Sequence, residues 1–181
     1  MSERENLFYD RIESPVGRLV IVADESGKLR MLSFDKGDDY WSREFKRLFP
    51  GATPAAKRNP FGFALKLKAY FEGDMAALES IPVRFQGTPF QNKVWKALRG
   101  IPVGTTTSYG ALARKIGEPK AMRAVGLANG SNPIAIVVPC HRVIGSDGTL
   151  TGFGGGLPRK KWLLEHEARH CAKEFQLEAS A

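Results

Sequence analysis

The first half of the chain begins with runs in which apolar and polar positions alternate with the two-residue period of β-strands. Strands are expected at residues 7–13, 18–23 and 29–34, because turn sequences containing Pro or Gly separate these runs. The pattern predicts a meander of three strands, followed later by a short fourth strand at 81–85.

Two helical patterns lie between the third and fourth predicted strands. The first begins at Asp38, which can cap a helix, and ends before Pro50. The second begins with Asn59-Pro60 and stops at Gly73, since proline favours the first helical position. Strands and helices together predict a small α/β unit, and none of its residues suggests catalysis.

The second half follows the 3.6-residue period of helices. Thr88 and Gln91 form a capping box ahead of the first of these helices. Two shorter helices are expected at 109–116 and at 119–130. Two short helices across a tight turn are typical of a helix-turn-helix.

Composition places the chain among ordinary globular proteins. Its 181 residues, of which 43% are hydrophobic and 25% charged, fit one large domain or two small ones and exclude disordered, collagen-like and coiled-coil proteins. Two cysteines cannot build a disulfide framework, and the N-terminal residues lack the apolar run of a secretory signal. The uncharged stretch 124–141 is interrupted by Pro and Asn, so it is not a membrane span. We therefore expect a soluble, cytoplasmic protein with no membrane partner.

The basic residues are unevenly distributed. In residues 1–85, 14 basic residues nearly balance 13 acidic ones, whereas residues 86–181 hold 13 basic and 6 acidic residues. A basic half attached to a balanced half favours a polyanionic partner, nucleic acid first, because phosphate contacts supply salt-dependent affinity. Ordinary surface solubility is the alternative explanation.

The second helix of the helix-turn-helix carries few side chains that could read bases. Ala124 and Gly126 are small, and Arg123 is its only long charged residue beyond the first turn. Direct readout in the major groove needs Arg, Lys, Asn or Gln at base edges, so we expect little sequence preference. Small residues would instead allow close approach to a narrow groove, with one arginine entering the base stack. Tight packing between helices would explain the same composition.

A continuous apolar run, 134–138, is typical of a buried strand and leads to Cys140-His141-Arg142. A free thiol near neutral pH is only a few per cent thiolate, so a nucleophilic cysteine needs a base or a positive field. His141 and Arg142 could supply both, although an inert core thiol is the other interpretation. Successive side chains of a strand point in opposite directions, so we expect a water molecule between His141 and Cys140.

A histidine that acts as a base needs a partner that fixes its tautomer. A last helix is predicted from Pro158, and its Glu165 and Glu167 are the candidate carboxylates. Before it lies the glycine-rich segment 152–156, which can approach a flat ligand and offer backbone N–H groups, or can simply connect two elements.

Three motifs in register carry a resemblance to a known family: Arg123-Ala124-Val125-Gly126, Asn129-Gly130-Ser131-Asn132-Pro133 and Pro139-Cys140-His141-Arg142-Val143. With them, most of the second half resembles the O6-alkylguanine-DNA alkyltransferases, also called methylated-DNA–protein-cysteine methyltransferases, without a gap. The resemblance implies an α/β, ribonuclease H-like domain at residues 1–85. It implies a mainly helical, winged helix-turn-helix alkyltransferase domain at residues 86–181.

The resemblance assigns the chemistry to five residues. Cys140 would accept the alkyl group, His141 would deprotonate it through a water molecule, and Glu167 would hold the imidazole. Asn132 matches the asparagine that ties the recognition helix to the active-site segment. Tyr109 matches the tyrosine that crowds the target phosphate and donates a hydrogen bond to the base.

For DNA binding, the resemblance implies that the second helix of the helix-turn-helix enters the minor groove. Arg123 would fill the base stack after the damaged guanine leaves it. Ala124 and Gly126 would let the helix backbone come close to the DNA.

The substrate pocket that the resemblance implies combines backbone and side chains. The backbone of Cys140, Val143 and Gly154 would hydrogen-bond the guanine edge. Phe153 stands where some members have tyrosine, which removes a hydroxyl group. Ala135 stands where some members have proline, which predicts a roomier pocket for bulkier alkyl groups.

The implied function is DNA repair by direct reversal of damage. A single-turnover enzyme would move the alkyl group from O6-alkylguanine, and from O4-alkylthymine, in double-stranded DNA to Cys140. No cofactor is expected, because the transferred group comes from the damaged base. No metal is expected either, since no cysteine or histidine precedes residue 140. We expect the protein to be a monomer.

Two other functions remain open. A helix-turn-helix DNA-binding protein would use Cys140 as a redox sensor and would bind specific sequences. A cysteine hydrolase would use Cys140, His141 and Glu167 on an acyl substrate and would turn over many times.

Overall fold

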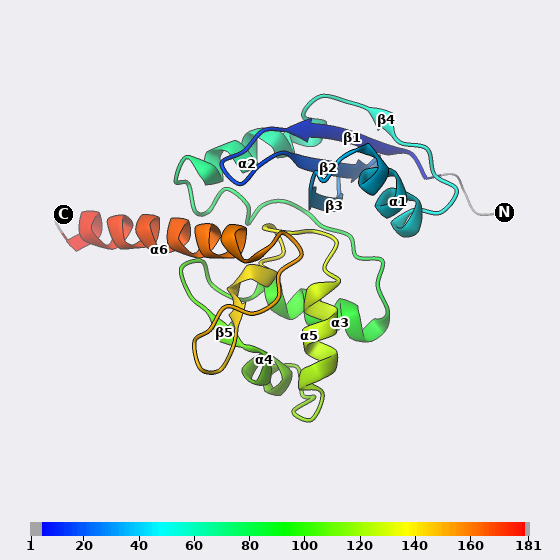
Figure 1. The fold of residues 1–181 in the computed structure, drawn as a ribbon. Helices are drawn as coiled ribbons and strands as arrows, with labels where there is room; N and C mark the ends of the chain where they lie inside the picture. The colour runs from blue at the N-terminus through cyan, green and yellow to red at the C-terminus, as the bar shows by residue number, and fades with distance from the viewer. Residues whose placement is uncertain (1–4, 180–181) are drawn as a thin grey trace.

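The computed structural model describes residues 5–179, which form two units on either side of a long helix (Figure 1). The first unit contains a four-stranded sheet in the order β3-β2-β1-β4. Its strands are β1 (Leu7–Ile12), β2 (Leu19–Asp24), β3 (Leu29–Phe34) and β4 (Ala55–Ala56). β1, β2 and β3 pair antiparallel, and β4 pairs parallel to β1. The predicted three-stranded meander is therefore confirmed.

The faces of the sheet are covered by two helices, α1 (Asp38–Leu48) and α2 (Phe63–Phe71). On one face, Val20 and Val22 of β2 share a buried cluster with Phe45 of α1. On the other face, Ile21 of β2 belongs to the same cluster as Leu67 of α2. Because successive side chains of a strand point to opposite faces, β2 is buried on both sides and forms the centre of this unit.

Two elements of this unit differ from the sequence prediction. The α-helix predicted from Asn59 begins at Phe63, after a short 3₁₀ turn. The strand predicted at 81–85 is a single parallel bridge from Val83 to β3. Its alternating pattern comes from side chains that pack on the core, not from a ladder of backbone hydrogen bonds.

The second unit is mainly helical and contains α3 (Pro89–Arg99), β5 (Thr107–Ser108), α4 (Tyr109–Lys115), α5 (Met122–Gly130) and β6 (Val143–Ile144). Thr88 caps α3 in the predicted capping box with Gln91. α4 and α5 form the predicted helix-turn-helix, and α3 packs against both. α5 begins at Met122 and not at Pro119, because a turn closed by the N–H of Ala121 and the carbonyl of Glu118 comes first.

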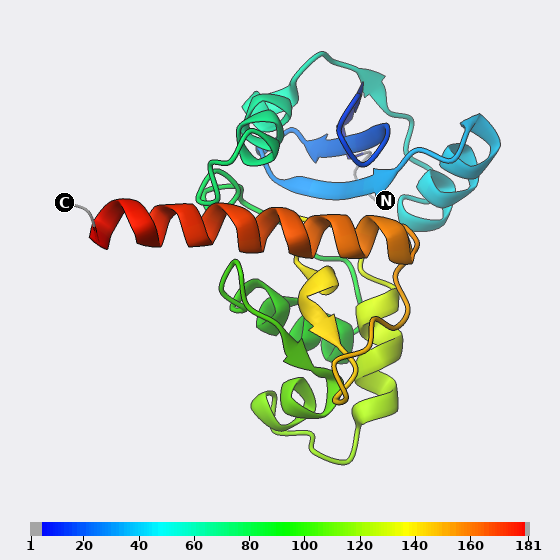
Figure 2. The same ribbon diagram turned by 60° about the vertical axis from the view of Figure 1, so that its left-hand side comes forward.

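The last helix, α6 (Leu157–Ala179), runs between the two units (Figure 2). One hydrophobic core joins all three parts: it includes Leu163 of α6, Leu67 of α2 and Val94 of α3. Within residues 5–179, no helix is long and apolar enough to cross a membrane. The position of α6 lets it present side chains to both units.

Strand β3 also connects the first unit to two segments of the second. The N–H of Leu32 donates to the carbonyl of Pro133 at 3.0 Å, and the N–H of Ala135 donates to the carbonyl of Leu32 at 2.8 Å. Lys36, just beyond β3, donates from Nζ to the carbonyl of Gly154 at 2.9 Å. The first unit therefore holds both the segment before the cysteine and the glycine-rich segment.

The apolar run 134–138 is not the strand that its composition predicts. After a single bridge at Ile134 the chain turns, and the N–H of Val138 donates to the carbonyl of Ile134 at 3.0 Å. Ile136 has a φ of 69°, a left-handed conformation that is rare for a β-branched residue. All five side chains are buried. A continuous apolar run indicates burial, and because a central strand and a buried turn are both buried, the run alone does not distinguish them.

Candidate active site

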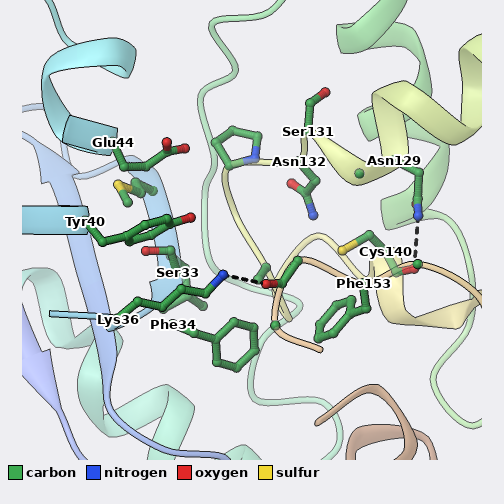
Figure 3. A pocket seen from close by; sticks show the side chains of 18 of the residues that line it. Ser33, Phe34, Lys36, Tyr40, Glu44, Asn129, Ser131, Asn132, Cys140 and Phe153 are labelled. Atoms are coloured by element: carbon green, nitrogen blue, oxygen red, sulfur yellow. Dashed lines mark hydrogen bonds between the residues drawn. The ribbon is translucent and has the colours of Figure 1, made fainter. Parts of the chain in front are cut away.

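Cys140 begins a 3₁₀ turn directly after this buried segment. The residue is 6% exposed and lines a cavity of about 130 Å³ between the two units (Figure 3). Asn132 and Phe153 belong to the wall from the second unit, and Lys36 and Tyr40 belong to the wall from the first. Ligand pockets usually measure roughly 300–1,000 Å³, so this cavity fits a small substituent and not a whole nucleotide.

Asn132 ties the cysteine segment to the end of α5. Its Nδ2 donates to the carbonyls of Val138 at 2.8 Å and Ile134 at 3.3 Å, and its Oδ1 accepts the N–H of Ile134 at 3.0 Å. Burial raises the pKa of the Cys140 thiol, while a hydrogen bond with Asn132 and the charge of Lys160 act in the opposite direction. The thiol is therefore protonated at rest and needs a base.

His141 is fully buried and faces Glu167. Its Nε2 lies 2.8 Å from Oε1 of that carboxylate. Burial lowers the pKa of the imidazole, so the ring is neutral and Nε2–H donates to Glu167. Nδ1 is then a lone-pair acceptor, and it has no hydrogen-bond partner among the described residues. The backbone turns at Cys140 instead of continuing as a strand, and the water expected between the two side chains stays a prediction.

Glu167, and not Glu165, is the carboxylate that turns inward. Besides His141, its oxygens accept from Nε and Nη2 of Arg142, both at 2.9 Å. Tyr70 of α2 donates its O–H to Oε1 at 2.8 Å. Burial alone would raise the pKa of Glu167, but the hydrogen bonds from His141 and Arg142 and the charge of Arg142 hold it well below its usual range.

Arg142 is therefore not the cation that acts on the thiol, which corrects the sequence-based expectation. Lys160 of α6 is instead the fully buried cation whose charge favours the ionised form of Cys140. Its Nζ donates to the carbonyls of Val143 at 2.6 Å and Thr151 at 2.7 Å. Sequence analysis missed this residue, because a lysine within a run of basic residues is typical of a helix surface.

The helix-turn-helix has an exposed surface on α5. Arg123 and Ala124 are exposed, and Gly126 is half-buried against the ring of Tyr109. Leu127, one turn beyond Arg123, is 77% exposed. Sequence analysis missed Leu127, because a leucine in an amphipathic helix is typical of a buried position.

The remaining predicted pocket residues lie around the glycine-rich segment. The Tyr109 hydroxyl is 3.5 Å from the carbonyl of Thr151. Phe153 meets the ring of Phe34 edge-on, with the centroids 5.7 Å apart, and Ala135 lines the cavity beside Cys140. In the described part of the chain, no group of three or more His, Cys, Asp or Glu side chains could hold a metal ion.

Two family models match the chain. The ribonuclease-like domain of 6-O-methylguanine DNA methyltransferase matches residues 7–85, and the DNA binding domain of 6-O-methylguanine DNA methyltransferase matches residues 89–169. Together the two matches span most of the chain. The domain boundary between residues 85 and 86 stays a prediction.

Curated relatives and solved structures match over nearly the same length. The methylated-DNA–protein-cysteine methyltransferase of Shigella flexneri is 45% identical over 167 residues, which are 89% of this chain and 95% of that protein. The protein of the same name from Mycobacterium tuberculosis is 44% identical over 175 residues, which are 94% of this chain and 98% of that protein. The crystal structure of M. tuberculosis O6-methylguanine methyltransferase has a TM-score of 0.74 at 41% identity and covers 91% of this chain and 94% of its own. The crystal structure of M. tuberculosis OGT in complex with DNA has a TM-score of 0.72 at 44% identity and covers 90% of this chain and 94% of its own.

Proposed function

The chain belongs to the 6-O-methylguanine DNA methyltransferase family, and from that premise we propose that Cys140 is the residue that accepts the alkyl group. The protein repairs DNA by transferring an alkyl group from DNA to one of its own cysteines. The chain has two cysteines. Cys140 lines the cavity beside the helix-turn-helix, whereas Cys171 lies against Gly104. The thiol at the cavity is the observation that carries the proposal.

The proposed reaction needs side chains of the protein and one bridging water molecule. His141 takes the thiol proton through Nδ1 and a bridging water, and Glu167 stabilises the imidazolium that forms. The thiolate attacks the alkyl carbon, so that an S–C bond forms while the bond from that carbon to O6 breaks. Tyr109 protonates the departing guanine and regains a proton from the imidazolium, so the thiol proton ends on the purine. Asn132 keeps the cysteine segment in place during the transfer.

Each protein molecule acts once in this scheme. The product on Cys140 is a thioether, which has no carbonyl group that water could attack. No step therefore restores the thiol, in contrast to the acyl-enzyme of a cysteine hydrolase.

We propose O6-alkylguanine in double-stranded DNA as the main substrate and O4-alkylthymine as a second. A base within the duplex must leave the stack to reach a buried thiol. A cavity of about 130 Å³ has room for the alkyl group, while the base would lie at its mouth against the backbone of Gly154. Val143 is fully buried and does not line this cavity, so its backbone contact with the base stays a prediction. Ala135 and the hydroxyl-free ring of Phe153 border that space and leave it apolar on one side.

The proposed DNA contact is the exposed surface of α5. Ala124 and Gly126 let the helix backbone approach a minor groove, and Arg123 replaces the base that has left the stack. The basic excess of residues 86–181 supplies phosphate contacts without sequence preference. We propose that a monomer acts on chromosomal DNA in the cytoplasm.

A labelling experiment tests the acceptor. Wild-type protein is mixed with duplex DNA that carries O6-methylguanine with a labelled methyl group. The wild type and Cys171→Ala should each take up one methyl group per molecule, located by mass analysis on the peptide that holds Cys140. Cys140→Ala should bind the duplex with unchanged affinity and take up no label. Label on Cys140→Ala, or more than one guanine repaired per protein molecule, would refute the proposal.

A further inference from the structure

Tyr70 brings the first unit into contact with the catalytic carboxylate. It is the penultimate residue of α2, it is fully buried, and its O–H donates to Oε1 of Glu167 at 2.8 Å. Its carbonyl lies 2.8 Å from Nε2 of His166, the neighbour of Glu167 on α6, and the two rings meet edge-on with centroids 5.3 Å apart. Backbone and side chain of Tyr70 are thus both attached to α6.

Oε1 of Glu167 receives three donors. These are Nε2 of His141 at 2.8 Å, Nη2 of Arg142 at 2.9 Å and the Tyr70 hydroxyl at 2.8 Å. Oε2 receives Nε of Arg142 at 2.9 Å. A carboxylate oxygen has about two lone-pair directions, so the three donors on Oε1 compete for the same electron density. Each donor therefore weakens the hold of Oε1 on the other two.

The Tyr70 hydroxyl acts as a donor throughout the working pH range. Burial, and then the negative charge of Glu167, raise the pKa of the phenol well above its usual range, so the hydroxyl stays protonated. Its O–H points at the same oxygen that receives Nε2–H of His141. It therefore reduces the attraction of the carboxylate for the imidazolium that forms when His141 accepts a proton. It also prevents the carboxylate from turning away from the ring.

We propose that Tyr70 is a positioning residue for alkyl transfer, which holds the Glu167 carboxylate in place and limits the proton affinity of His141. The inference rests on the proposed roles of Cys140 and His141. It gives the ribonuclease-like unit a part in the chemistry, although the reacting groups all belong to the other unit.

Tyr70→Phe tests the inference, because it removes one oxygen and keeps the ring. Without the competing O–H, Oε1 attracts the imidazolium more strongly, so the acidic limb of the rate profile should move to higher pH. On the acidic limb the rate constant at a given pH should fall about tenfold, which corresponds to a displacement of the limb by about one pH unit. The loss should shrink as the pH rises, because His141 is then neutral in both proteins.

The other charged groups around His141 are the same in both proteins. They are Glu167 and Lys160 from α6 and Arg142 from the turn that holds His141 itself. The rate is measured on methylated duplex DNA and on the free base O6-benzylguanine. The loss should be equal with both substrates, since the step affected is the activation of sulfur, and the affinity for the duplex should not change.

Tyr9→Phe is the matched control, because it removes a hydroxyl group from β1 of the same unit, where Tyr9 is partly buried against the core cluster on the other face of the sheet. It should keep the wild-type rate and profile. A wild-type profile for Tyr70→Phe, or an equal loss at every pH, would overturn the inference. If Tyr70→Phe does not fold, Tyr70→3-fluorotyrosine replaces it. Because a more acidic phenol is a stronger hydrogen-bond donor, the acidic limb of the rate profile should move to lower pH. An acidic limb that does not move would overturn the inference.

The two proposals fail separately. Label on Cys140→Ala would remove the acceptor and the inference with it. An unshifted profile of Tyr70→Phe, with label still confined to Cys140, would remove the inference alone.

Discussion

Replacing Glu167 by glutamine takes one negative charge out of the buried centre of the site and keeps the shape of the side chain. The carboxylate is 1% exposed and accepts hydrogen bonds from His141, Arg142 and Tyr70. The amide has one oxygen that accepts and one NH₂ group that only donates. Whichever side the NH₂ takes, it faces at least one donor of Arg142. The substitution therefore leaves a buried guanidinium without its counter-charge.

The magnitude follows from the surroundings of Arg142. Its side chain is 10% exposed, and among the described residues its one other hydrogen-bond partner besides Glu167 is the carbonyl of Ile101, at 2.6 Å. Removing one member of a buried ion pair costs about 3–5 kcal/mol. Because the amide still accepts one hydrogen bond, we expect a loss near the lower end, about 3 kcal/mol. For a chain of this size, such a loss lowers the Tm by roughly 6–12 °C.

The loss should depend on pH in a defined direction. The pKa of Glu167 is lower in the folded protein than in the unfolded chain, where it is about 4.3. The carboxylate therefore contributes stability that is fully present above that value and is lost as the pH falls below it. Glutamine does not titrate, so the gap between wild type and Glu167→Gln should narrow by about 1.4 kcal/mol for each pH unit below 4.3.

Urea unfolding of wild type and variant at pH 7 and pH 3 measures both effects. Glu165→Gln is the control on the same helix, because Glu165 is exposed and forms an ion pair with Lys161 at 3.7 Å. This substitution should change the free energy of unfolding by less than about 0.5 kcal/mol. The reasoning is refuted if Glu167→Gln lies within about 1 kcal/mol of wild type at pH 7. It is equally refuted if the difference at pH 3 is as large as at pH 7.

Two further substitutions test the proposed DNA contact and the substrate pocket. Leu127→Ala should weaken duplex binding about tenfold, as measured by fluorescence anisotropy, because this α5 leucine is 77% exposed and would be buried against the minor groove. The rate of transfer from free O6-benzylguanine should stay unchanged. Leu65→Ala, at a leucine of α2 that is 64% exposed, should leave binding unchanged, and equal effects of both would contradict the proposed contact. Ala135→Val should slow transfer from O6-benzylguanine more than transfer from the methylated base, because it narrows the cavity yet keeps the N–H that donates to Leu32. Equal slowing of both substrates in a rate comparison would show that the cavity does not select by size.

Features set by neighbouring residues could be predicted from the sequence. The capping box of Thr88 depends on two side chains within one turn, and the structure contains both of its hydrogen bonds. The first helix of the helix-turn-helix begins after Ser108, whose hydroxyl oxygen accepts the N–H of Ala111, and it ends before Gly117, which has a positive φ. Both residues adjoin the helix in the sequence. Glu167 was one of two candidates, because inward and outward positions of a partly buried helix alternate within a few residues.

Features set by long-range packing could not be predicted. Tyr70 meets Glu167 across 97 positions of sequence, and nothing near either residue indicates the contact. Lys160 differs from its neighbour Lys161 only in the face of α6 on which it lies. The run 134–138 is apolar because it is buried, and whether a buried segment extends or turns depends on the elements around it.

The pairing of β3 bears on how the chain reaches its folded state. β3 lies at one edge of the sheet, and an edge strand with unpaired backbone groups can pair with strands of other chains. Here the outer backbone groups of Leu29 and Leu32 are taken by Pro82, Arg84, Pro133 and Ala135, so residues from later in the chain seal the sheet. The first unit expressed without the second would expose the unpaired backbone N–H and C=O groups of β3 and would self-associate. The two units are therefore interdependent, and denaturation of the whole protein should proceed as one cooperative event.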